Sequence, residues 1–158
     1  ESSIPQEGFF CNNATSAILK SVWEHEKFDE ELTGLEDMAL AKQLLKKNLR
    51  IGYVASSVVY HLHDETWKQV KWRYERESYA LRHIMPEVHV SFFDFLRYTL
   101  NAIFLDIVQS LKDGVFFRYF IEIIQFRTMQ YWGTFRGNQE HRKLSSSMKE
   151  RYFYPKNK

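Results

Sequence analysis

Two adjacent carboxylates, Glu36 and Asp37, are the residues of this sequence best suited to acid–base chemistry. They open an apolar-periodic segment that predicts a helix over residues 36–48. A carboxylate at a helix N-terminus is held by the helix dipole and by free backbone N–H groups, which gives the rigidity that a general base needs. Thr33 lies three residues before Glu36, so the same pattern also fits a capping box. The pair predicts a catalytic base or a helix cap, and both interpretations stay open.

Paired amides precede this segment at Asn12 and Asn13, within a run of Asn, Thr and Ser residues. Each amide offers two donors and an acceptor, which suits the binding of hydroxyl-rich ligands. The same residue types also favour turns, because they form local hydrogen bonds with the backbone. The stretch therefore predicts either a turn or one wall of a polar pocket.

Two histidines, His61 and His63, follow the short β-branched and aromatic run at residues 58–60. In extended backbone, residues two apart point to the same side, so both imidazoles and Asp64 could meet a divalent metal ion. Two histidines alone do not complete a metal site. A solvated surface pair is the alternative interpretation.

Alternation and composition predict two strands, over residues 49–54 and 58–60, and several helices. A helix is predicted over residues 66–85, closed by Pro86. Its Arg73 and Arg76 could reach a diphosphate or could simply be solvated. A helix capped by Ser91 and a second helix ending near Gly133 are predicted on either side of a break at residues 113–114.

Net charge is distributed unevenly along the 158 residues. Residues 1–65 carry six Lys and Arg against eleven Asp and Glu, a net −5, whereas residues 66–158 carry sixteen against nine, a net +7. The aromatic helices within residues 90–133 are interrupted by too many charges to cross a bilayer, but they could lie in its interface, pack on a partner or pack on their own domain. Cys11 is the one cysteine, which excludes an internal disulfide, and no signal peptide is visible.

Four segments in a fixed order carry a resemblance to a known family. These are FFCNNATSA (residues 9–17), FDEEL (28–32), GLED (34–37) and VVYHLH (58–63). Together they resemble the second half of a family 2 glycosyltransferase with the GT-A fold, and YWGTFRG (131–137) is similar to the tails of polysaccharide-assembly members. The resemblance implies an α/β fold. It also implies that the chain comprises three parts. These are the acceptor-side half of a GT-A domain over residues 1–85, a helical, membrane-associated extension over 86–137 and a polar basic tail over 138–158.

The resemblance also implies roles for the acceptor side of the reaction. Asp37 matches the catalytic base that deprotonates an acceptor hydroxyl, and Glu36 helps to hold the acceptor. Asn12 and Asn13 line the acceptor pocket opposite the base. The deprotonated hydroxyl then attacks the anomeric carbon of a nucleotide-activated sugar with inversion of configuration.

On the donor side, the resemblance implies that His61, or alternatively His63, binds a divalent cation, Mg²⁺ or Mn²⁺, which neutralises charge on the leaving diphosphate. Arg73 and Arg76 assist by binding the diphosphate. The sequence departs from the family pattern because it contains no Asp-x-Asp metal motif. We therefore expect a fragment that lacks the donor-binding half and is inactive by itself.

The intact enzyme is expected to be cytoplasmic and peripheral on the inner face of the cell membrane. It would transfer a sugar to a glycan or lipid-linked acceptor during cell-surface polysaccharide synthesis, with no role for nucleic acid. Two rival functions remain. One is a non-catalytic α/β binding or scaffold module, and the other is a metal-dependent hydrolase built on His61, His63 and Asp64.

Overall fold

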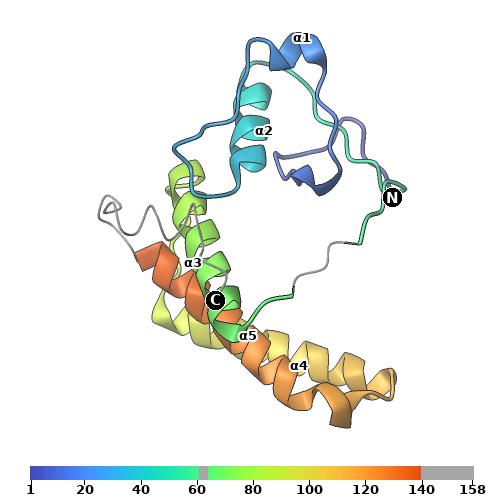
Figure 1. Cartoon of the computed structure of the whole chain (residues 1–158), viewed down its shortest axis with the longest axis vertical. Helices are drawn as coiled ribbons and strands as arrows, with labels where there is room; N and C mark the ends of the chain where they lie inside the picture. Colours follow the sequence, from blue (N-terminus) through green and yellow to red (C-terminus); the bar gives the residue numbers. More distant parts are fainter. Residues whose placement is uncertain (61–63, 140–158) are drawn as a thin grey trace. The chain divides into compact units, whose positions relative to one another are not determined.

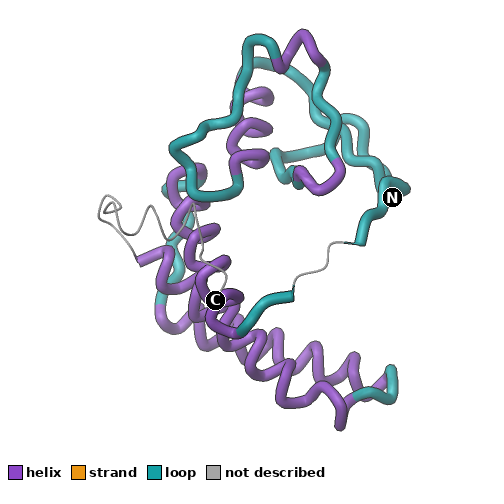
Figure 2. The backbone as a smooth tube through the Cα atoms, in the orientation of Figure 1, coloured by secondary structure: helices purple, strands orange, loops and turns teal. Residues whose placement is uncertain are grey.

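The computed structural model describes residues 1–60 and 64–139, and the chain divides into two compact units, Glu1–His63 and Asp64–Lys158. The regular elements among the described residues are helices (Figures 1 and 2). In chain order they are the 3-10 helix η1 (Asn13–Thr15) and the α-helices α1 (Lys20–Trp23), α2 (Glu36–Lys46), α3 (Trp67–Ile84), α4 (Phe92–Lys112) and α5 (Phe116–Gln139).

The predicted α/β fold, the C-terminal half of a GT-A domain, is wrong for the residues that the structure describes. The predicted strand over residues 49–54 meets the N-terminal segment at one isolated bridge, between Ser3 and Tyr53, and residues 58–60 form no strand. Pro5 has no backbone N–H, so it cannot donate to a longer ladder. Alternating β-branched residues favour extended backbone, but a sheet also needs neighbouring strands to pair with.

Helix α2 is the main regular element of the N-terminal unit, and it buries Leu40 and Ala41. The predicted start at Glu36 is confirmed, but the predicted cap is wrong. Leu35 is the N-cap residue, with a left-handed backbone at φ 58° and no capping hydrogen bond from its side chain, so Thr33 does not occupy the cap position. A capping box centred on Thr33 therefore does not explain why Glu36 and Asp37 stand at the start of α2.

The C-terminal unit consists of α3, α4 and α5, and two of its helix starts carry capping boxes. Thr66 and Gln69 cap α3 reciprocally, as do Ser91 and Asp94 at the start of α4. These caps satisfy backbone N–H groups that the first helical turn leaves without partners. The helix predicted over residues 66–85 and the cap predicted at Ser91 are both confirmed.

Helix α5 packs closely on α3 through two glycines. A Cβ atom at Gly133 would lie 2.3 Å from the carbonyl oxygen of Lys71, and one at Gly137 would lie 2.1 Å from that of Glu75. The predicted helix end near Gly133 is wrong, because α5 continues to Gln139. Glycine is required here by the close approach of two backbones and does not mark a helix end.

Helix α5 also packs along α4, and the two run side by side (Figure 1). Arg127 of α5 donates two hydrogen bonds to the Asp106 carboxylate of α4, from Nε at 2.6 Å and from Nη2 at 2.9 Å. Asn138 is fully buried, and its side chain bonds the backbone of residues 88 and 90, before α4. None of the described helices is long and apolar enough to cross a membrane.

We predict that Gly133→Ala destabilises the C-terminal unit. At an open helical position this change adds up to about 1 kcal/mol of stability, whereas overpacking against Lys71 costs about 1–3 kcal/mol. Urea unfolding followed by circular dichroism measures the difference. Gln125→Ala, an exposed change in the same helix, is the control and should be near neutral. An unchanged or raised midpoint for Gly133→Ala would show that the two backbones do not approach so closely.

Candidate functional site

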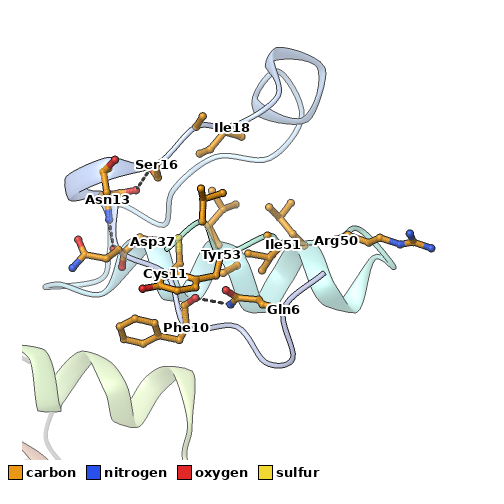
Figure 3. Close-up of a pocket in the computed structure, with 18 of the residues that line it drawn as sticks. Gln6, Phe10, Cys11, Asn13, Ser16, Ile18, Asp37, Arg50, Ile51 and Tyr53 are labelled. Carbon is orange, nitrogen blue, oxygen red and sulfur yellow. Dashed lines mark hydrogen bonds between the residues drawn. The ribbon is translucent and has the colours of Figure 1, made fainter. Parts of the chain in front are cut away.

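The N-terminal unit contains a cavity of about 660 Å³ that brings several predicted site residues together. Asp37 enters it from the first turn of α2, and Asn12 and Asn13 enter it from the start of η1. Phe10 and Tyr53 add aromatic side chains to its lining (Figure 3). Its walls come from the N-terminal segment, η1, α2 and residues 49–57.

Two backbone N–H groups fix the Asp37 carboxylate. Oδ2 accepts a hydrogen bond from the N–H of Asn13 at 2.8 Å, and Oδ1 accepts one from the N–H of Met38 at 2.7 Å. Figure 3 shows the bond between Asp37 and Asn13 across the cavity wall. A carboxylate offers about four acceptor positions, so this geometry leaves capacity for a ligand hydroxyl.

The two amides are also held in place, each through its carbonyl oxygen. Asn12 Oδ1 accepts from the backbone N–H of Ala14 at 2.9 Å and so caps η1. Asn13 Oδ1 accepts from the Ser16 hydroxyl at 3.1 Å. With the oxygens so oriented, the NH₂ groups of both amides can donate to a ligand. The predicted turn and the predicted polar wall are therefore parts of one arrangement.

One side of the cavity is apolar and follows α2. Asp37, Leu40, Ala41 and Leu44 recur at helical spacing and all line it, so the carboxylate and an apolar surface share one face of the helix. The distance along the helix axis from residue 37 to residue 44 is about 10 Å. The cavity thus offers polar groups at the start of α2 and an apolar wall farther along it.

Cys11 also lines the cavity, and its environment disfavours the thiolate. Burial raises the pKa of the Cys11 thiol above its ordinary value, and the nearby Asp37 carboxylate raises it further. In the sequence, Cys11 served only to exclude an internal disulfide. Its position directly before the two asparagines was the available signal that it lies in the same site.

The other predicted site residues lie elsewhere. Glu36 occupies the first position of α2 and is not among the described residues that line the cavity. Arg73 and Arg76 belong to α3 of the C-terminal unit. The guanidinium of Arg73 is paired with the Glu65 carboxylate at 2.8 Å, which offsets its charge.

The predicted metal ligands His61 and His63 lie outside the described residues. Across residues 1–60 and 64–139, no group of three or more His, Cys, Asp and Glu side chains could hold a metal ion. The polar groups that line the described cavity are the Asp37 carboxylate, the Cys11 thiol, the Arg50 guanidinium, and several amides and hydroxyls, those of Gln6, Asn12, Asn13, Thr15, Ser16, Tyr53 and Ser57.

Comparisons of this chain with protein-family models, with curated proteins and with solved structures find no match. The site is therefore interpreted from its own residues, and membership of glycosyltransferase family 2 stays a prediction.

We predict that Asp37→Asn lowers the pKa of Cys11, because the change removes a negative charge beside the thiolate. At a pH below the Cys11 pKa, a larger thiolate fraction then makes alkylation by iodoacetamide faster. The pH profile of the alkylation rate measures this shift. Glu24→Gln, a carboxylate-to-amide change at α1, serves as the control. Superimposable profiles for Asp37→Asn and the unchanged chain would place the carboxylate away from Cys11.

Proposed function

We propose that the N-terminal unit binds the hydroxyl-bearing acceptor of a sugar-transfer reaction and that Asp37 is the general base. The observation that carries this proposal is the bond between Asp37 and Asn13 in the wall of one cavity. Residues assigned separately to the base and to the acceptor pocket lie together there, although they are 24 positions apart in the chain.

The composition of the cavity supports a sugar-like or lipid-linked acceptor. Amide NH₂ groups and a carboxylate can bond hydroxyls, while the Phe10 and Tyr53 rings can pack on the apolar faces of a ligand. The apolar wall at Leu40 and Leu44 suits a hydrophobic group attached to the acceptor. A cavity of about 660 Å³ is in the usual range for small-molecule sites.

The proposed step balances through one proton transfer and one displacement. The acceptor hydroxyl gives its proton to Asp37 while its oxygen bonds to the anomeric carbon of the donor. The bond from that carbon to the nucleoside diphosphate breaks, and the diphosphate leaves with the electron pair. We assign no donor-binding residue within 1–60 and 64–139. A divalent cation bound by His61 or His63 stays a prediction.

A non-catalytic binding module is the second candidate, and one observation favours it. Both described hydrogen bonds of Asp37 run to backbone N–H groups, so the carboxylate also holds η1 against α2. In this alternative the cavity binds a ligand without chemistry. Both candidates predict that the cavity binds a ligand. Only the first predicts that Asp37 raises the rate of sugar transfer.

We predict that Asp37→Asn lowers the rate of sugar transfer by about 100- to 10,000-fold, the usual contribution of a general base. The amide keeps the size of the side chain and one acceptor oxygen, so it can retain the bond from the Asn13 N–H but loses the one from the Met38 N–H. Acceptor affinity is therefore measured beside the rate, and the loss of rate should greatly exceed the loss of affinity. Release of nucleoside diphosphate from a panel of nucleotide sugars is measured with the product of the complete reading frame.

Glu24→Gln is the matched control, because it removes a carboxylate of the same unit that does not line the cavity. It should keep the full rate. Transfer activity that survives Asp37→Asn unchanged would reject the base, and acceptor binding without any transfer activity would favour the binding module.

A further inference from the structure

Helix α4 exposes several of its large apolar side chains and buries small ones, while Phe95 packs on Trp132 and Phe135 of α5. On one face it buries Thr99, Ala102 and Ser110. An apolar stripe lies on a different face. Four of its five members recur at helical spacing about half a turn from Ala102, and Leu96 lies at the edge of the stripe nearer the buried face. The stripe consists of Phe93, Leu96, Leu100, Phe104 and Leu111, which are 81%, 39%, 66%, 63% and 57% exposed.

The stripe is long and continuous. From residue 93 to residue 111 it covers about 27 Å of helix. Single exposed apolar residues are ordinary, but a contiguous apolar surface of this length marks an interaction site. The α5 contacts lie on the other side of α4, where Arg127 pairs with Asp106, so α5 does not cover the stripe.

We infer that the apolar stripe of α4 docks on an anionic lipid surface, with the helix lying in the plane of the interface. Small residues at helix contacts and large apolar residues facing outward are the arrangement that suits helices in lipid. The close contact of α5 with α3 at Gly133 and Gly137 follows the same pattern. An amphipathic helix of this kind lies in the interface, with its apolar face toward the acyl chains.

Charge favours lipid over a second copy of the chain. The two acids of α4 are bonded within the unit, Asp94 to Ser91 and Asp106 to Arg127. Arg97 pairs with Asp94 at 3.2 Å, but its side chain is 68% exposed beside the stripe and stays within reach of an anionic surface. Residues 140–158 add six Lys and Arg against two Glu in the sequence. Residues 66–158 as a whole carry a net +7, so an anionic surface attracts this part of the chain, whereas the same part of a second copy carries the same positive charge and repels it.

The test compares two neighbouring residues of α4 in the full 158-residue chain. Phe104→Ser removes a member of the stripe, and Leu105→Ser is the matched control, because Leu105 is 55% exposed but lies about 100° farther round the helix. Binding is measured by flotation with vesicles of phosphatidylcholine, with and without phosphatidylglycerol. Circular dichroism checks that both variants fold.

We expect the unchanged chain to float with the anionic vesicles, less so with neutral ones, and less at high salt. Phe104→Ser should bind about tenfold more weakly, and Leu105→Ser should bind about as well as the unchanged chain. Three results would overturn the inference: no flotation, equal losses in both variants, or a dimer in sedimentation equilibrium that Phe104→Ser dissociates. The last result would assign the stripe to a second copy.

Discussion

The hydrogen bond from the Asn13 N–H to the Asp37 carboxylate joins the two segments that build the cavity of the N-terminal unit. No sheet among the described residues positions η1 and the start of α2, and this bond ties the two directly, while the Thr15 and Ser57 hydroxyls tie η1 to the segment that follows α2. A bond to a carboxylate is stronger than one between neutral groups, so it can hold two exposed segments together. It also orients the carboxylate, because the Met38 N–H holds the second oxygen.

The C-terminal unit is stabilised in a different way. It depends on backbone approach, since α5 can pack on α3 only while Gly133 and Gly137 carry no Cβ. Asn138 then joins the end of α5 to the segment before α4. These contacts bring small and polar residues of α4 and α5 against their neighbours, and the large apolar residues on the far side of α4 stay on the surface. The exposed stripe is thus a direct consequence of how the three helices pack.

Sequence patterns predicted the helices of this chain well, because their signals are local. Thr66 and Ser91 are caps with partners three residues later, and the apolar periodicity of the following segments extends over many turns. The strands were predicted less well, since a strand requires a partner that the sequence of the strand does not specify. Residues 49–54 illustrate this, because Tyr53 alternates as a strand residue should and yet forms a single bridge. Gly133 was misinterpreted for a similar reason, because only the tertiary contact with α3 shows why a glycine is needed.

Residue type alone pointed to Asp37, Asn12 and Asn13, and the structure brings these three residues to one cavity, while their roles stay predictions. The site was not predictable at Cys11 or at Glu36, whose positions depend on how η1 meets α2. The most direct test of the proposed acceptor site is the backbone amide spectrum of the ¹⁵N-labelled chain during titration with methyl and octyl glycosides. We predict shifts centred on Asn13 and Met38, with the octyl glycosides extending them to Leu44. Shifts confined to residues 64–139, or none for any glycoside, would contradict this prediction.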